Sequence, residues 1–156
     1  MDILAENRGI DEQLFHAILT ESKSMPALQT MGIAINYLGP GTAGLKMVCE
    51  HKFANHLGLI HGAVISALID NAMGYSIESL GLRCVTLDMN LNYILPIYEG
   101  TEVRVEGYVL HAGKKTAVTE ASVYTNTGKL AAKGRGTFYV TGPFKLDSKP
   151  KKGLQP

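Results

Sequence analysis

The chain has 156 residues, of which 46% are apolar and 19% charged, a composition typical of one soluble globular domain. A formal net charge of +1 argues against a strongly charged surface, so we expect no nucleic-acid partner. No apolar run approaches the roughly 20 residues of a membrane span, and the start "MDILAENRGI" lacks the apolar segment of a signal peptide. We interpret Cys49 and Cys84 as reduced thiols and expect a cytoplasmic protein without membrane contact.

The first third of the chain predicts one short helix followed by two strands. In "IDEQLFHAILTES", Ile10, Leu14 and Ile18 recur at helical spacing, which indicates an amphipathic helix. "MGIAINYLGPGTAGLKMVCEHK" is typical of two strands around a Gly/Pro turn.

The rest of the chain predicts one long helix and then four strands. The apolar segment from about His61 to Leu80 is helical in pattern and ends near Gly81. In the next segment, "CVTLDMNLNYILP", the period changes to two, which is typical of a half-buried strand. The alternation places on its apolar face Val85, Leu87, Met89, Leu91 and Tyr93, and on its polar face Thr86, Asp88, Asn90 and Asn92. "TEVRVEGYVLHAG", "KTAVTEASVYTN" and "KLAAKGRGTFYVT" predict three more strands joined by tight turns.

This order of elements predicts an α+β fold, in which one antiparallel sheet covers one long helix. We expect an N-terminal helix and lead-in over residues 1–29 and the main domain over 30–141. Residues 142–156, "GPFKLDSKPKKGLQP", are basic and rich in proline and lysine, and we expect a flexible tail there.

Asp70 is unusual because it lies in the middle of the apolar helix. An ionised carboxylate buried there costs several kcal/mol unless it is paired, reaches a cleft or is used in chemistry. Small side chains share its helical face, which leaves room beside it; they are Ala63, Ser66, Ala67 and Gly74. The structural alternative is a carboxylate that caps a neighbouring backbone group or pairs with a base.

The start of the same helix offers a second chemical feature. Gly62 lies in the first turn, where backbone N–H groups are unpaired and the helix dipole is positive. This end can stabilise a developing oxyanion, and Asn55 in the preceding loop can donate and accept hydrogen bonds. An electrophile-stabilising helix end and a nearby base are the minimum for hydrolysing an activated acyl group.

The stretch "NHLGLIHGAVISALIDNAMG" resembles the motif of hotdog-fold acyl-CoA thioesterases of the phenylacetate-degradation (PaaI-like) type. That motif has an asparagine, a spacer with glycine, His-Gly-Gly, and an aspartate nine residues after the histidine. It corresponds here to Asn55, Gly58, His61, Gly62 and Asp70. The resemblance covers roughly residues 30–141. Ala63 replaces the second glycine of the family pattern, which bears on the substrate rather than on the chemistry.

The resemblance implies a sheet wrapped around the central helix, and homodimers that can pair into tetramers. It implies active sites at the subunit interface, where the aspartate of one chain faces the helix start of the other. Hydrolysis of acyl-CoA would then use Asp70 as general base or nucleophile and the Gly62 N–H as the group that polarises the carbonyl. Asn55 would orient the thioester or the water, and His61 would hold the loop and contact the thioester end. Thr86 would orient the attacking water. No cofactor and no metal are implied.

The resemblance also implies residues that bind the substrate. We expect Gly58, Ala63 and Ser66 to line its reactive part. Two groups of residues are expected to lie along the nucleotide of CoA. The first is the loop with Gly113, Lys114 and Lys115, and the second is the strand with Lys133, Arg135 and Gly136. The alternative is that these basic residues are ordinary solvated side chains.

Other patterns carry less weight. "GPGTAG" satisfies a dinucleotide-binding pattern, but it leads into a strand and not into a helix. His51, His56 and His61 recur every five residues, a spacing that aligns side chains on neither a helix nor a strand, so a metal site is not expected. Cys84 lacks a recognisable partner for nucleophilic catalysis.

Two alternative functions remain open. The same fold serves as a non-catalytic acyl-CoA sensor in some regulators, although no helix-turn-helix region is visible here. A hotdog hydratase or dehydratase is the other, but those relatives place a histidine and an acid differently.

Overall fold

The computed structural model describes residues 4–146 of the chain. Its elements in chain order are β1 (Glu6–Asn7), α1 (Glu12–Ser24), α2 (Pro26–Met31), β2 (Ala34–Gly39), β3 (Thr42–Val48), the 3-10 helix η1 (His51–Phe53), α3 (Gly62–Glu78), β4 (Leu82–Tyr93), β5 (Glu102–Ala112), β6 (Thr116–Thr125) and β7 (Leu130–Pro143). The predicted long helix and the four strands after it are confirmed, and so are the two strands before it.

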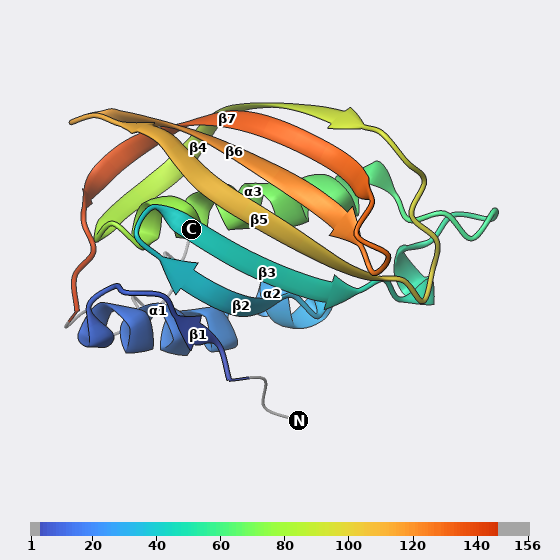
Figure 1. Ribbon diagram of the computed structural model, residues 1–156, viewed down its shortest axis with the longest axis horizontal. Helices are drawn as coiled ribbons and strands as arrows, with labels where there is room; N and C mark the ends of the chain where they lie inside the picture. Colours follow the sequence, from blue (N-terminus) through green and yellow to red (C-terminus); the bar gives the residue numbers. More distant parts are fainter. Residues whose placement is uncertain (1–3, 147–156) are drawn as a thin grey trace, which may run out of the picture.

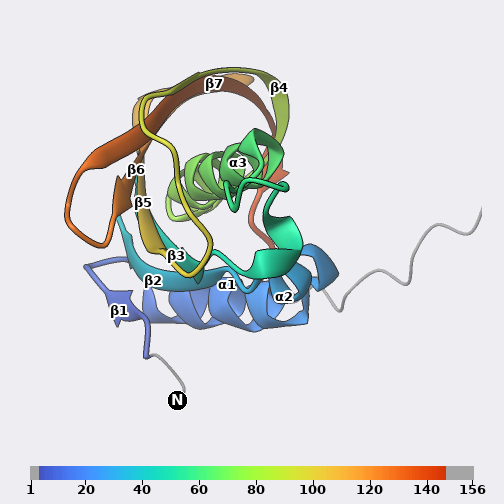
Figure 2. The same cartoon turned by 90° about the vertical axis from the view of Figure 1, so that its right-hand side faces the viewer.

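The strands form one sheet in the order β1-β2-β3-β5-β6-β7-β4. All neighbours are antiparallel except β1 and β2, which are parallel. The sheet curves around α3, which lies along its concave face, while α1 and α2 lie beside β2 (Figures 1 and 2). The fold is therefore α+β with one central helix, as the sequence predicts.

The helix approaches the sheet closely because glycines line the contact. A Cβ atom on Gly107 of β5 would come within 2.4 Å of the Ala72 carbonyl oxygen, a contact that no side chain can make. On β7, a Cβ on Gly136 would lie 3.0 Å from the Met73 methyl group. Without these side chains, α3 packs its apolar residues directly onto the strand backbones.

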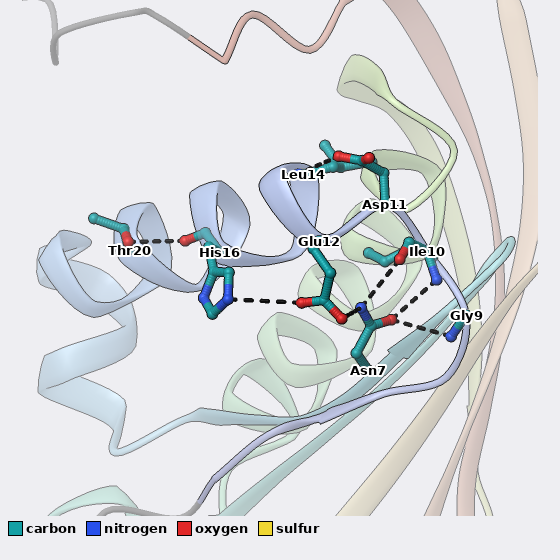
Figure 3. Close-up of polar contacts among 8 residues, drawn as sticks. All are labelled: Asn7, Gly9, Ile10, Asp11, Glu12, Leu14, His16 and Thr20. Atoms are coloured by element: carbon teal, nitrogen blue, oxygen red, sulfur yellow. Dashed lines mark hydrogen bonds and ion pairs between the residues drawn. The ribbon is translucent and has the colours of Figure 1, made fainter.

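The N-terminal segment is more structured than the sequence predicts. Besides α1 it contains β1 and α2, and α1 is capped by Asp11, whose side chain accepts the Leu14 N–H at 3.0 Å. Asn7 joins β1 to α1: its oxygen accepts the N–H groups of Gly9 and Ile10, and its amide donates to Glu12 (Figure 3). Local side-chain capping therefore fixes the connection between these two elements.

The predicted face of β4 is partly wrong. Leu87 is bulged out of the ladder, since Thr86 pairs with Phe138 and Asp88 with Thr137. A bulge adds one residue and exchanges the two faces of a strand. Val85 and Leu87 are consequently more than half exposed, whereas Thr86 bonds to a side chain of α3. Of the expected apolar face, Met89 and Leu91 are partly buried against the core and Tyr93 is exposed.

The ordered domain continues past residue 141. β7 runs to Pro143, and Phe144 is buried under the Arg83 guanidinium, which lies 3.6 Å from its ring centroid. Pro143 and Phe144 therefore belong to the folded part of the chain, and residues 147–156 of the expected tail lie outside the described residues.

Candidate active site

Asp70 lies half-buried on α3, next to β4. The Thr86 hydroxyl donates a hydrogen bond of 2.7 Å to Oδ1 of Asp70. Further along the same two elements, the Cys84 thiol faces the Gly74 carbonyl oxygen at 3.9 Å. Within residues 4–146 no basic side chain lies within ion-pair distance of Asp70. The carboxylate is thus held by a hydroxyl and is not neutralised by an arginine or lysine.

A cavity of about 140 Å³ opens beside this carboxylate, and we call it the Asp70 groove. Its lining residues are Met25, Asp70, Asn71, Gly74, Tyr75, Glu78, Cys84, Val85, Thr86 and Phe138. Gly74 provides the space on the helix, one turn after Asp70. The groove can therefore admit a small group to the carboxylate.

One end of the groove is charged. Arg83 donates to Glu78 at 2.9 Å and to Glu21 of α1 at 2.5 Å, so it links three elements. Burial raises the pKa of Glu78 despite this contact, and burial also raises the pKa of the Cys84 thiol to about 12. The Tyr75 hydroxyl is buried without a hydrogen-bond partner in the described part of the chain, and burial raises its pKa. Because burial raises its pKa, the Cys84 thiol is protonated at neutral pH.

The start of α3 faces a second cavity, of about 330 Å³, which we call the helix-start cavity. It is lined by Asn55, Leu59, Ile60, His61, Gly62, Ile65, Tyr93, Leu95, Pro96, Ile97, Ala131 and Ala132. His61 is the N-cap residue, and no side chain caps the helix. The Val64 N–H bonds to the His61 carbonyl at 3.0 Å, whereas the N–H groups of Gly62 and Ala63 precede the first intrahelical bond. Two backbone donors are thus left for a ligand.

Asn55 shapes the loop before the helix. Its side-chain oxygen accepts the N–H groups of Leu57 at 2.9 Å and Leu59 at 3.1 Å. Gly58 completes this turn with a φ of 72°, a left-handed conformation that glycine adopts without strain. The oxygen of Asn55 therefore stabilises the loop, and its amide nitrogen is the group left to donate to a ligand.

Tyr93 is a site residue that sequence reasoning missed. Its hydroxyl donates to the Gly62 carbonyl oxygen at 3.0 Å, and its ring covers Gly62 so closely that a Cβ there would lie 3.0 Å from Cζ. The sequence places Tyr93 on the apolar face of its strand, and nothing in that pattern links it to residue 62. An aromatic residue with a polar group at the end of a strand is the only available signal.

Within one chain the two cavities are separate. Their sets of lining residues do not overlap. Asp70 follows Gly62 by eight residues on α3, which corresponds to about 12 Å along a helix axis. The structure brings Asp70 and Thr86 together, and Asn55, His61 and Gly62 together, but it does not bring the two groups together. Ala63 and Ser66 line neither cavity, and the Ser66 hydroxyl donates to the Ala63 carbonyl at 2.9 Å.

The residues expected along CoA have other partners. Arg135 donates to Glu120 at 2.7 Å, and Lys133 lies 3.2 Å from the same carboxylate. Hydrogen bonds from Tyr108 and Arg135 lower the pKa of Glu120 to about 2. Gly136, as described above, packs against α3. Their contacts with a nucleotide stay predictions.

The hairpin between β5 and β6 presents the other expected CoA residues. The Gly113 N–H bonds to the Thr116 carbonyl at 2.8 Å and closes the turn. Lys114 and Lys115 follow it and are exposed. These two lysines are accessible to an anionic ligand.

The described residues also bear on the patterns set aside above. "GPGTAG" forms the turn from β2 into β3, not a helix start. Residues 4–146 contain no group of three or more His, Cys, Asp or Glu that could hold a metal ion. None of the described helices is both long and apolar enough to cross a membrane. Cys49 and Cys84 are free thiols.

A curved, mostly antiparallel sheet around one long central helix is the architecture of the hotdog fold. A profile of the Thioesterase superfamily matches residues 57–132. Human acyl-coenzyme A thioesterase 13 is 34% identical over 104 residues, which are 65% of this chain and 74% of that protein.

Solved structures share the fold of this chain. The Escherichia coli PaaI protein of phenylacetic acid degradation has the same fold, with a TM-score of 0.81 and 22% identity over 86% of this chain and 98% of that chain. A Streptococcus mutans protein bound to acetyl CoA has a TM-score of 0.70 and 27% identity, over 72% and 91% of the two chains. The chain belongs to the thioesterase superfamily, as a PaaI-like hotdog thioester hydrolase.

Proposed function

We propose that the protein is an acyl-CoA thioesterase, which hydrolyses an acyl-CoA thioester to a free carboxylic acid and CoA. The observation that carries the proposal is the position of Asp70, a carboxylate in an apolar helix that is hydrogen-bonded to Thr86 and lines an open groove. The substrate class is that of human acyl-coenzyme A thioesterase 13 and of the PaaI thioesterase of Escherichia coli. The Streptococcus mutans structure with acetyl CoA supports binding of the CoA part.

In the proposed reaction, the Gly62 N–H donates a hydrogen bond to the thioester carbonyl oxygen and stabilises the oxyanion. A preorganised donor of this kind is worth about 3 kcal/mol of the barrier. Asp70 takes a proton from water, which adds to the carbonyl carbon, or attacks the carbonyl carbon itself. The C–S bond then breaks and the thiolate of CoA takes up the proton; where Asp70 itself has attacked, water then hydrolyses the acyl–Asp70 anhydride to the free acid and the regenerated carboxylate. Asn55 and His61 hold the thioester end, and the Thr86 oxygen orients the water.

Two solved structures of one relative support the roles of Asp70 and Thr86. Structures of a Streptococcus pneumoniae hypothetical thioesterase, each 25% identical to this chain, carry an aspartate-to-alanine or a threonine-to-alanine replacement. The replaced threonine follows the replaced aspartate by 16 positions, the separation between Asp70 and Thr86.

The proposed active site needs two copies of the chain. Asp70 and the helix start line different cavities of one chain, so a complete site requires Asp70 of one protomer beside the helix start of its partner. β4 is the edge strand of the sheet and exposes Val85 and Leu87, which suits pairing with a second copy. The dimer is the smallest active form, and two dimers can pair into a tetramer. The exposure of Lys114 and Lys115 supports a contact with the CoA phosphates.

The test is hydrolysis of a panel of aryl-, medium-chain and long-chain acyl-CoAs, followed by the release of free thiol. Asp70→Asn and Asp70→Ala should lower kcat by a factor of about 10²–10⁴, as expected for loss of a general base or nucleophile. Asp88→Asn is the matched control, because Asp88 lies on β4 but does not line the groove. Undiminished turnover by both Asp70 variants contradicts the proposal. Tight acyl-CoA binding by the wild type without thiol release would indicate a binding protein instead.

A further inference from the structure

Tyr93 contacts the first residue of α3 in a specific way. It is the last residue of β4, and its side chain is 56% exposed, so it does not serve to fill the core. Its hydroxyl donates to the Gly62 carbonyl oxygen at 3.0 Å. Its ring lies over the Gly62 Cα, where an added Cβ would meet Oη at 3.2 Å. The side chain thus fixes one peptide unit at the helix start.

That peptide unit has two ends. The carbonyl of Gly62 and the N–H of Ala63 belong to the same planar group. A hydrogen bond accepted by the carbonyl fixes the orientation of the plane and polarises the N–H on its other side. Because Ala63 is the second residue of α3, its N–H has no intrahelical acceptor and is directed out of the helix start. Tyr93 therefore acts on a free donor next to the Gly62 N–H.

We propose that Tyr93 is a positioning residue, which holds the Ala63 N–H as a second donor to the thioester carbonyl oxygen. This inference rests on the proposed function. It gives β4 two tasks: Thr86 near one end orients the group that reacts with the thioester, and Tyr93 at the other end orients the oxyanion donors. In a dimer these two ends of β4 serve different active sites.

The first test is Tyr93→Phe, which keeps the ring and removes the hydroxyl. Loss of a hydrogen bond that orients a transition-state donor should lower kcat about tenfold and leave KM unchanged. Tyr98→Phe is the matched control, since Tyr98 is equally exposed at 57% and does not line the helix-start cavity. A wild-type kcat for Tyr93→Phe, or a change in KM alone, would overturn the proposal.

A second variant separates positioning from general packing. Ala63→Pro removes the N–H through which Tyr93 is proposed to act, and proline is tolerated in the first turn of a helix. If Tyr93 acts through this N–H, adding Tyr93→Phe to Ala63→Pro should cause no further loss of kcat. Two losses that multiply would show that Tyr93 acts by another route.

A third measurement does not depend on turnover. In the amide NMR spectrum of the free protein, the Ala63 proton should move upfield in Tyr93→Phe, because its peptide carbonyl loses a hydrogen bond. An unmoved Ala63 resonance would overturn the positioning role. If Asp70→Asn hydrolyses acyl-CoA like the wild type, the proposed function fails, whereas a normal Tyr93→Phe beside an inactive Asp70→Asn rejects only the role of Tyr93.

Discussion

The Thr86 hydroxyl and the Asp70 carboxylate are joined by a hydrogen bond of 2.7 Å between β4 and α3. The bond depends on the bulge at Leu87, because a regular strand would direct Thr86 to the opposite side from Met89 and Leu91, which pack on the core. An irregularity in the edge strand therefore places a hydroxyl next to the proposed base.

The first prediction concerns this pair. Thr86→Val keeps the shape of the side chain but removes the hydroxyl, so the carboxylate and the attacking water lose their orientation. We expect kcat to fall about tenfold. Thr86→Ser should keep most of the activity because it keeps the hydroxyl. Steady-state kinetics of both variants would measure these changes in kcat. Equal kcat values for Thr86→Val and the wild type would contradict the proposed role of the Thr86 hydroxyl.

The second prediction concerns Gly74, which lines the Asp70 groove. In Gly74→Ala the new methyl group would meet Phe138 at 3.9 Å, an ordinary contact. Alanine is better than glycine inside a helix by about 1 kcal/mol, so the free energy of unfolding should rise by about that amount. The methyl group also narrows the groove, so kcat/KM should fall for bulky acyl groups. A more stable variant with unchanged kcat/KM for every acyl-CoA would exclude the groove as a substrate site.

Gly107→Ala provides the contrast to that variant. Its Cβ would come within 2.4 Å of the Ala72 backbone oxygen, so β5 or α3 must shift. We expect a loss of about 3 kcal/mol in the free energy of unfolding. Urea denaturation of both variants at one protein concentration would measure the two opposite effects.

The third prediction concerns the cluster of Arg83, Glu21 and Glu78. Arg83→Met leaves the two carboxylates without their common partner, and we expect a loss of about 2 kcal/mol at neutral pH. The loss is smaller than for a fully buried pair because Arg83 is 30% exposed.

The pH dependence follows from the raised pKa of Glu78, which burial causes. The native state keeps the Glu78 proton at pH values where the unfolded chain has released it, so stability falls as pH rises from the ordinary glutamate pKa towards the native one. Removal of Arg83 raises the native pKa further, so the Tm of Arg83→Met should decline more steeply across this window than that of the wild type. Adding Glu78→Gln should flatten the decline. A decline that persists in the double variant would assign it to another group.

The fourth prediction concerns the edge of the sheet. Leu87→Lys places a charge on β4, where a second copy is proposed to pair, and should give an inactive monomer in sedimentation. Leu110→Lys is the control, because Leu110 is similarly exposed, at 46%, but lies on β5 inside the sheet order. A monomeric Leu87→Lys with wild-type kcat would contradict a site shared between protomers.

The fifth prediction tests the shared site by complementation. Asp70→Asn and Asn55→Ala should each be inactive, because each removes one half of the site. A mixture refolded together forms mixed dimers, in which an intact Asp70 faces an intact helix start at one of the two sites. Random pairing should restore about a quarter of wild-type activity. A mixture as inactive as its components would indicate that both halves come from one chain.

The sequence by itself determined the elements that depend on local patterns. The helical and alternating periods identified α3, the strands around it and the α+β class, since each pattern reflects burial within one element. The spacing of Asn55, His61 and Asp70 was equally visible, because loop, helix start and helix are continuous in the chain. The roles that follow from this motif stay predictions.

The tertiary structure alone decided which of these elements meet. The bulge at Leu87 depends on the pairing of β4 with β7, and so the direction of Thr86 towards Asp70 could not be read from the alternation of its strand. The bond from Tyr93 to Gly62 spans 31 positions, and that from Arg83 to Glu21 spans 62. Contacts between residues so far apart in the sequence leave no periodic signal, since they form only when the helices and strands pack together.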